Sequence, residues 1–243
     1  MKFVLLAAGK SKRIYNKIKK NKCLLKIRNK TIIQNSLDQA LKSNIEDLFV
    51  VVGFNANKIK LHLKKNKKIR YIFNSKFNSS EMMHSLILAL KEINDDIIFG
   101  YSDVLISEKV LKKILKFKRK NITIPVLSNW KKIWKIRGKN PYEDAETLII
   151  KKNSNLSSIG EKIKKLKEIK YQFMGIVYIP KSKRNFILNL YKKIKNKKNL
   201  HLTTFINKLL KEKVKVQSIK VTDNWYEFDD YQDYINYKKY YLK

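Results

Sequence analysis

The stretch Phe3-Val4-Leu5-Leu6-Ala7-Ala8-Gly9-Lys10-Ser11-Lys12-Arg13 decides how this chain is interpreted. Its residues 3–6 are an unbroken apolar run, short and sharply bounded, which predicts a buried strand. Two alanines and a glycine then lead into a loop with three cations. Small residues let the backbone approach a ligand closely, and loop N–H groups beside Lys and Arg suit a polyphosphate. A basic strand-to-helix turn without a ligand would contain the same residues, so the residues alone leave both interpretations open.

Length and composition indicate a folded protein with one α/β domain. The chain has 243 residues, of which 44% are hydrophobic, so it can bury a core and is too apolar to be disordered. No apolar run approaches the roughly 20 residues that cross a bilayer, and the first run is much shorter than that of a signal peptide. The single cysteine, Cys23, excludes an internal disulfide and suits a reducing compartment. We therefore expect a cytoplasmic protein without a membrane span.

The charge is strongly positive, with 56 Lys and Arg against 20 Asp and Glu and a formal net charge of +36. Such a charge favours nucleic acid or an anionic membrane as a partner. However, the cations are mostly Lys spread over the whole chain, whereas base-specific DNA readers use Arg in a local patch. An AT-rich genome would impose the same excess of Lys, Asn and Ile. We therefore expect no specific nucleic-acid partner, and a basic nucleic-acid-binding protein is the alternative. In either case the positive electrostatic field of the protein should attract anionic substrates such as nucleotides.

Runs of β-branched residues alternate with helical apolar spacing along the chain. After the first strand, we expect strands over 48–52, 69–73, 97–100, 122–126, 147–150, 171–179 (interrupted by Gly175) and 214–221, and helices over 30–43, 57–65, 81–93, 107–117, 184–194, 203–211 and from 231 onward. A Trp-rich, charged segment lies between 126 and 147. This alternation predicts a doubly wound, mostly parallel Rossmann-like α/β sheet with right-handed crossovers and an inserted β region.

Polar side chains follow two of the expected strands. Ligands of such sheets lie beyond the C-terminal ends of the strands, where Arg13 and Asp103 are expected. A carboxylate at this edge suits Mg²⁺, which prefers a few carboxylates together with substrate oxygens. A helix-capping or turn aspartate would occupy the same position, so the residues leave the role of Asp103 open.

The first loop also carries a family resemblance. Residues 6–9 with Arg13, followed by Asn21-Lys22-Cys23-Leu24-Leu25, resemble the signature L-A-A-G-x-G-x-R and P-K-x-L of the nucleotidyltransferases that activate sugar phosphates and phosphocholine. Ser11 replaces the second glycine, and Asn21 replaces the proline. The resemblance implies a GT-A-like fold, a triphosphate contact from Arg13, a phosphate contact from Lys22, and nucleotide binding by Leu6, Ala7, Ala8 and Gly9.

Two further segments resemble the metal-binding parts of that family. Residues 96–103 are similar to the segment that ends in a metal-binding aspartate, here Asp103. Residues 225–229 resemble the W-x-E-x-D element, whose final aspartate, here Asp229, is the second ligand. The resemblance therefore implies that Asp103 and Asp229 hold Mg²⁺. Asp230 and Asp233 are neighbours that could be mistaken for Asp229.

The middle of the chain is similar to a subgroup near the phosphocholine cytidylyltransferases and the domains paired with phosphonate synthesis. The similar stretches are 129–134, Arg137, Pro141, 144–147, 159–160, 171–175, and Asn74 with 80–86. In that subgroup Asn74 and Ser85 would lie beside the nucleotide. The resemblance implies CTP as a substrate. The chain shows no internal repeat and, with three prolines and six glycines, no flexible linker, which predicts a single domain over 1–243 with a nucleotide-binding half over about 1–120 and a substrate-side half over about 121–243.

The aromatic and acidic residues of the second half suggest the acceptor. A choline or aminoethyl head group is a cation, which aromatic faces and carboxylates hold. Candidate substrate residues are Trp130, Trp134, Tyr101, Tyr171, Phe173, Asp144 and Glu146. Core packing alone explains most Trp and Tyr residues.

We therefore expect a Mg²⁺-dependent nucleotidyltransferase that joins CMP from CTP to phosphocholine, 2-aminoethylphosphonate or a similar small phospho-compound and releases pyrophosphate. The alternative is a sugar-1-phosphate nucleotidyltransferase that makes an NDP-sugar. A sugar substrate would require several neutral hydrogen-bonding side chains instead of aromatic rings and carboxylates. The sequence leaves the oligomeric state open, a homodimer included.

Overall fold

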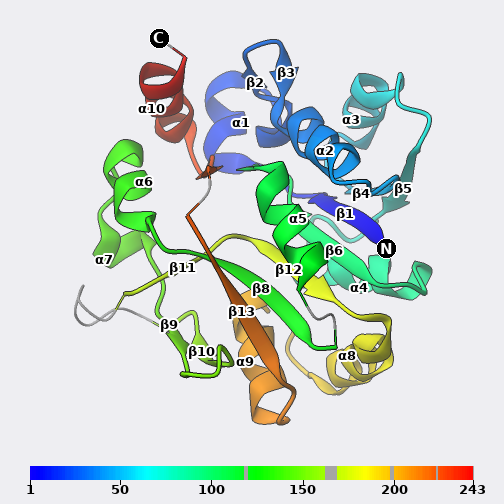
Figure 1. The fold of residues 1–243 in the computed structure, drawn as a ribbon. Helices are drawn as coiled ribbons and strands as arrows, with labels where there is room; N and C mark the ends of the chain where they lie inside the picture. The colour runs from blue at the N-terminus through cyan, green and yellow to red at the C-terminus, as the bar shows by residue number, and fades with distance from the viewer. Residues whose placement is uncertain (118–119, 162–168, 198–199, 223, 243) are drawn as a thin grey trace.

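The computed structural model describes residues 1–117, 120–161, 169–197, 200–222 and 224–242. In these ranges a central sheet lies between helices (Figure 1). The strands are β1 (Lys2–Ala7), β2 (Lys26–Ile27), β3 (Lys30–Thr31), β4 (Asp47–Val52), β5 (Ile69–Phe73), β6 (Ile97–Tyr101), β7 (Val104–Ile106), β8 (Ile122–Leu127), β9 (Leu148–Ile150), β10 (Leu156–Ile159), β11 (Gln172–Phe173), β12 (Ile176–Ile179), β13 (Val216–Val221) and β14 (Trp225–Glu227).

The helices occupy the segments between these strands. They are α1 (Lys12–Ile18), the 3₁₀ turn η1 (Lys22–Leu24), α2 (Ile32–Lys42), α3 (Ala56–Leu63), α4 (Met82–Glu92), α5 (Glu108–Lys116), α6 (Trp130–Arg137), α7 (Pro141–Asp144), α8 (Lys181–Lys193), α9 (Leu202–Lys211) and α10 (Tyr231–Tyr241). None of the helices in the described ranges is long and apolar enough to cross a membrane.

The central sheet has a parallel core, as the alternation of strands and helices predicts. In the described part of the chain it contains eight strands. Strand β1 lies between β4 and β6, β5 lies outside β4, and all four are parallel. Strand β12 runs antiparallel to β6 and to β8, and β13 is parallel to β8. The predicted doubly wound, mostly parallel α/β fold is confirmed, and the β9–β10 ribbon lies in the predicted β region.

Helices cover both faces of this sheet because successive strand residues point to opposite sides. Phe3 and Leu5 of β1 face one apolar cluster, to which α2, α5 and α6 contribute. Val4 and Leu6 face a second cluster, to which α4, α8 and α9 contribute. The runs of consecutive apolar residues in β1 and β4 thus reflect burial on both faces, as in other parallel sheets.

Two predictions of local structure are wrong. Lys12 and Arg13 belong to the first turn of α1 and not to a loop, because Ser11 adopts a left-handed conformation (φ 54°) and the helix begins directly after it. Helices α6 and α7 occupy the Trp-rich, charged segment for which no helix was expected. In α6 the buried positions 130, 133, 134 and 137 have helical spacing, and Arg137 is one of them, so a purely apolar pattern does not reveal the face.

The interruption at Gly175 is confirmed, and it shapes the sheet. Strands β11 and β12 on either side of Gly175 both pair with β8, while Gly175 itself has φ +68° and its carbonyl accepts a hydrogen bond from the Tyr101 N–H (3.1 Å). A Cβ atom at Gly175 would lie 2.7 Å from the ring of Tyr101. The glycine therefore provides the space in which the Tyr101 ring sits.

We expect Gly175→Ala to lower the free energy of unfolding by about 1–3 kcal/mol, because it adds backbone strain and a clash with Tyr101. Urea unfolding followed by circular dichroism measures the effect. The control is Gly9→Ala, whose Cβ would meet no atom within 4 Å and should change stability by less than about 0.5 kcal/mol. Equal midpoints for the two variants would contradict this role for Gly175.

Candidate active site

A two-stranded ribbon brings the two candidate metal ligands together. Asp103 lies between β6 and β7, and Asp229 follows β14. Strands β7 and β14 pair antiparallel, with Glu227 opposite Val104, and the Phe228 N–H donates to the Asp103 carbonyl (3.0 Å). The aspartates are far apart in sequence, but this pairing fixes both at the C-terminal edge of the sheet. This is the edge at which the sequence predicts a ligand site.

Lys22 lies between the two aspartates. Its Nζ is 3.1 Å from Asp103 Oδ2 and 3.2 Å from Asp229 Oδ1, and all three side chains are largely buried. Burial lowers the pKa of Lys22, but the charges of Asp103 and Asp229 more than offset this and the net pKa is raised. The three residues that sequence analysis placed at a phosphate and metal site are therefore in contact.

The two departures from the nucleotidyltransferase signature have structural roles in the loop that carries Lys22. The Ser11 hydroxyl accepts a hydrogen bond from the Lys22 N–H (3.2 Å). Asn21 is buried, and its amide donates to the Phe54 carbonyl (3.3 Å) and accepts from the Asn55 amide (2.9 Å). Side-chain hydrogen bonds thus hold the turn η1 at the position where the signature has a proline.

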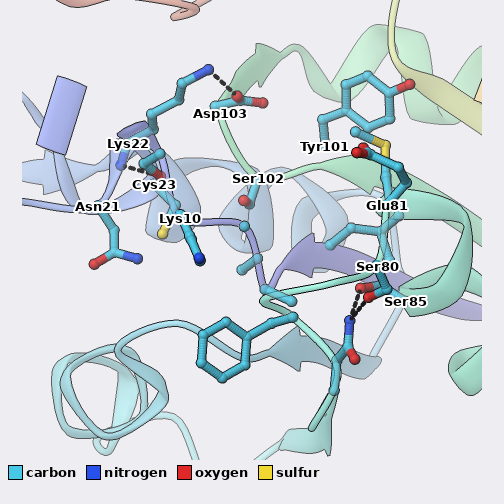
Figure 2. Close-up of a pocket in the computed structure, with 18 residues that line it drawn as sticks. Lys10, Asn21, Lys22, Cys23, Ser80, Glu81, Ser85, Tyr101, Ser102 and Asp103 are labelled. Carbon is cyan, nitrogen blue, oxygen red and sulfur yellow. Dashed lines mark hydrogen bonds and ion pairs between the residues drawn. The ribbon is translucent and has the colours of Figure 1, made fainter. Parts of the chain in front are cut away.

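A pocket of about 280 Å³ lies beside Lys22 and Asp103, whose ion pair Figure 2 shows, and Lys10 of the first loop also lines it. Arg13 does not line this pocket. It is 65% exposed and contacts Asp229 Oδ1 from the other side (3.2 Å). The lining includes the remaining predicted nucleotide residues Leu6, Ala7, Ala8, Gly9, Asn74 and Ser85.

Asn74 fixes the wall of the pocket, because its amide is already engaged by the protein. The residue is 1% exposed, and its Nδ2 donates to Ser80 Oγ (3.2 Å) and Ser85 Oγ (3.0 Å). Its Oδ1 accepts from the Lys76 N–H (2.9 Å). Asn74 therefore holds the loop after β5 against α4 and gives the pocket its shape.

The structure does not support the prediction that Trp130 and Trp134 offer ring faces to a substrate. They are 2% and 4% exposed and belong to the core. Trp134 stacks on Trp225 (5.9 Å, 8° between planes), and the Arg137 guanidinium lies 5.0 Å from the centre of its ring. Tyr171 likewise has a protein cation, Lys220, over its ring at 5.0 Å.

Tyr101 lies beside carboxylates. It lines the pocket and packs edge-on against Phe173 (6.3 Å). Burial first, and then the charges of Glu227 and Glu146, raise the pKa of the Tyr101 phenol well above its ordinary value. Asp144 points instead to Arg137 (3.3 Å). Of the aromatic residues that the sequence offered as substrate contacts, Tyr101 is therefore the one that lines the pocket.

Sequence analysis did not assign Glu227 a role, and it named Arg137 only within a motif. Glu227 precedes Asp229 by two residues, so the two extend to the same side of an extended chain. Burial, and then the charge of Asp229, raise the pKa of Glu227 well above its ordinary range. The spacing Glu-x-Asp after a strand was a usable signal for Glu227.

The donor set fits a magnesium ion. Asp103 and Asp229 both lie within ion-pair distance of one Nζ atom, so their oxygens converge on the space of one cation. Among the described residues no group of three or more His, Cys, Asp or Glu could hold a metal. Two carboxylates with substrate phosphate oxygens completing the shell are the arrangement that Mg²⁺ commonly takes.

Comparison with known proteins identifies the family. Residues 3–157 match the MobA-like NTP transferase domain, so the chain belongs to that family and is a nucleotidyltransferase. It is 27% identical over 248 residues to the CTP:phosphoglutamine cytidylyltransferase of Campylobacter jejuni subsp. jejuni serotype O:2, a match that covers 96% of this chain and 97% of that protein.

Solved structures show the same fold. The CTP:phosphocholine cytidylyltransferase from Streptococcus pneumoniae superposes with a TM-score of 0.76 at 18% identity, covering 100% of this chain and 99% of that chain. The inositol-1-phosphate CTP transferase from T. maritima gives 0.76 at 17% identity, covering 96% and 90%.

Gly53 sets the distance between two walls of the pocket. A Cβ atom there would lie 2.6 Å from Phe77 Cβ and 2.9 Å from the Ala8 carbonyl oxygen, and both Phe77 and Ala8 line the pocket. We expect Gly53→Ala to weaken binding of the nucleoside triphosphate about tenfold, which corresponds to about 1.4 kcal/mol.

Isothermal titration with CTP and Mg²⁺ measures this change. Gly100→Ala is the matched control, because its Cβ would have no neighbour closer than 3.7 Å. Equal affinities of the two variants would show that the Gly53 contact does not control the pocket.

Proposed function

We propose that this chain is a Mg²⁺-dependent cytidylyltransferase that transfers CMP from CTP to a small phosphorylated acceptor with an ammonium group. The observation that carries the proposal is the convergence of Lys22, Asp103 and Asp229 from three segments of the chain onto one point beside the pocket. CTP is favoured because the Campylobacter relative, which is similar over nearly the whole chain, is a CTP-dependent enzyme by name.

In this reaction an oxygen of the acceptor's phosphoryl group attacks the α-phosphorus of CTP in line. The bond from that phosphorus to the oxygen bridging the β-phosphorus breaks, and this oxygen leaves with the electron pair as part of pyrophosphate. A magnesium ion held by Asp103 and Asp229 would neutralise phosphate charge. Lys22 and Arg13 would bind phosphate oxygens and balance the charge of the leaving pyrophosphate, and the small residues 7–9 leave room for the nucleotide against the backbone.

The charges that act on Tyr101 support an acceptor with an ammonium group. An ammonium group is stabilised by an aromatic face and by carboxylates, and Tyr101 has Glu227 and Glu146 as neighbouring charges. Phosphocholine and 2-aminoethylphosphonate both carry such a cation. Phosphoglutamine, the acceptor in the name of the Campylobacter relative, also contains an amino group.

A pyrophosphate-release assay of four nucleoside triphosphates against phosphocholine, 2-aminoethylphosphonate, phosphoglutamine and glucose 1-phosphate tests the proposal. We expect CTP with an ammonium-bearing acceptor to react at least tenfold faster than any pair with glucose 1-phosphate, since contacts of about 1–2 kcal/mol distinguish them. Faster reaction of glucose 1-phosphate with UTP or dTTP would replace this proposal by an NDP-sugar synthase.

Asp103→Asn and Asp229→Asn should each reduce kcat on the order of 10³-fold while the protein stays folded. The reason is that a metal ligand contributes several kcal/mol of charge stabilisation to phosphoryl transfer. Asp230→Asn is the control, because Asp230 caps α10 and asparagine also caps helices. Steady-state kinetics measures kcat, and circular dichroism checks that each variant is folded. Mg²⁺-dependent turnover near the wild-type rate in either variant would show that the replaced residue is not a metal ligand.

Glu146→Gln should raise KM for the cationic acceptor about tenfold and leave KM for CTP nearly unchanged, since it removes one negative charge near Tyr101. Glu143→Gln in the neighbouring helix α7 is the matched control, because Glu143 is exposed and its carboxylate accepts a hydrogen bond from Asn140 of the same segment. A parallel rise of both KM values in Glu146→Gln would indicate structural damage and contradict a role in acceptor binding.

A further inference from the structure

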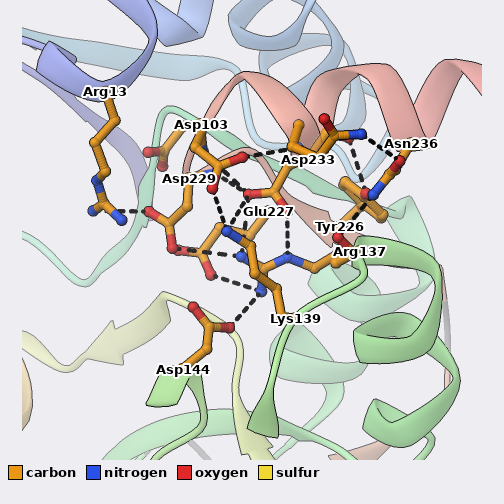
Figure 3. Close-up of polar contacts among 12 residues, drawn as sticks. Arg13, Asp103, Arg137, Lys139, Asp144, Tyr226, Glu227, Asp229, Asp233 and Asn236 are labelled. Carbon is orange, nitrogen blue, oxygen red and sulfur yellow. Dashed lines mark hydrogen bonds and ion pairs between the residues drawn. The ribbon is translucent and has the colours of Figure 1, made fainter.

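Arg137 is a charged residue in the interior whose guanidinium contacts carboxylates from three parts of the chain. Its side chain is 0% exposed. Figure 3 shows it pointing from α6 into a group of acids between α10 and the ribbon β7–β14. Burial lowers the pKa of Arg137, but Glu227, Asp233 and Asp144 more than offset this, so the net pKa is raised. The guanidinium is therefore a permanent buried cation.

One side of the guanidinium is fixed by Asp233. Nε donates to Asp233 Oδ1 (3.0 Å) and Nη2 donates to Oδ2 (3.3 Å), a bidentate pair in which both residues are fully buried. Asp233 Oδ2 also accepts from the backbone N–H groups of Asp229 (2.8 Å) and Asp230 (3.1 Å). The pair therefore ties α6 to the backbone that carries Asp229.

The outer nitrogens reach the site itself. Nη2 contacts Asp229 Oδ2 (3.4 Å), while Asp229 Oδ1 faces Lys22 (3.2 Å) and Arg13 (3.2 Å). Nη1 donates to Asp144 Oδ2 (3.3 Å) on the acceptor side. The two oxygens of Asp229 thus have different partners, since the interior Arg137 contacts Oδ2 whereas Lys22 and Arg13 contact Oδ1.

We propose that Arg137 is a positioning residue that fixes the Asp229 carboxylate so that Oδ1 stays directed at the metal and triphosphate. The inference rests on the metal-binding role of Asp229 in the proposed function. A lysine cannot replace Arg137, because a single ammonium lacks the planar fork that contacts Asp233, Asp229 and Asp144 at once.

Arg137→Lys provides the test, with Mn²⁺ as the probe. Electron paramagnetic resonance measures Mn²⁺ binding to the protein with α,β-methylene-CTP, and pyrophosphate release measures the Mg²⁺ concentration for half-maximal activity. We expect both constants to rise at least tenfold, while the affinity for α,β-methylene-CTP without metal changes less than about threefold. A merely structural role would lower the thermal midpoint and weaken all of these together.

Arg184→Lys is the matched control, because Arg184 of α8 donates to the backbone carbonyls of Leu90 and Lys91 and to the Asn185 side chain, away from the site. It should leave Mn²⁺ binding unchanged. Wild-type Mn²⁺ affinity in folded Arg137→Lys overturns the inference. Should that variant not fold, Asp233→Asn, which breaks the bidentate pair, carries the same expectation, and unchanged Mn²⁺ affinity there overturns it too.

These outcomes are separable from those of the proposed function. Wild-type protein that binds Mn²⁺ with the analogue but turns over no acceptor would refute the proposed reaction. The Mn²⁺ affinities of wild type and Arg137→Lys would still test the role of Arg137. Wild-type protein that binds no Mn²⁺ would refute the metal role of Asp229, and this inference with it.

Discussion

The contact of one lysine with two aspartates is the constraint on which the rest of this site depends. Charged groups removed from water are costly unless they are paired, and Lys22, Asp103 and Asp229 come from η1, the end of β6 and the end of β14. Their pairing requires the sheet, the β7–β14 ribbon and the turn η1 to keep fixed relative positions. The fold itself therefore assembles this cluster, in which one ammonium group is paired with two carboxylates.

The local charge of the site is opposite in sign to the net charge of the protein. Ion pairs join four cations, Arg13, Lys22, Arg137 and Lys139, to six acids, Asp103, Asp144, Glu227, Asp229, Asp230 and Asp233. In a chain of net charge +36, six acids thus outnumber the four cations that pair with them, and the raised pKa values of Glu227 and Asp144 reduce this local excess of negative charge. A divalent cation is the ligand that this excess suits, whereas the surrounding positive field favours approach of a triphosphate.

The sequence predicted the parts of the fold that depend on simple periodicity. Buried parallel strands such as β1 and β4 are continuous apolar runs, and the break at Gly175 was visible because glycine interrupts such a run. Helix α6 was missed because its buried face includes a charged residue, Arg137. The helical spacing of its buried positions is therefore not visible in the pattern of apolar residues alone. The convergence of Lys22, Asp103 and Asp229 came from motif resemblance, since no local pattern shows which distant residues meet.

The error over Trp130 and Trp134 has a cause that is specific to this composition. Aromatic rings attract cations, and in a chain with 56 Lys and Arg the protein supplies those cations itself. Arg137 lies over Trp134 and Lys220 over Tyr171, so these rings already have cationic partners. Carboxylates are the scarce group here, only 20 in number, and those without a nearby protein cation are the better guide to a cationic ligand. Glu146 has no ion pair with Lys or Arg among the described residues, and His201 is the nearby charge that lowers its pKa against the effect of burial, so its role toward the acceptor stays a proposal for the Glu146→Gln variant to test.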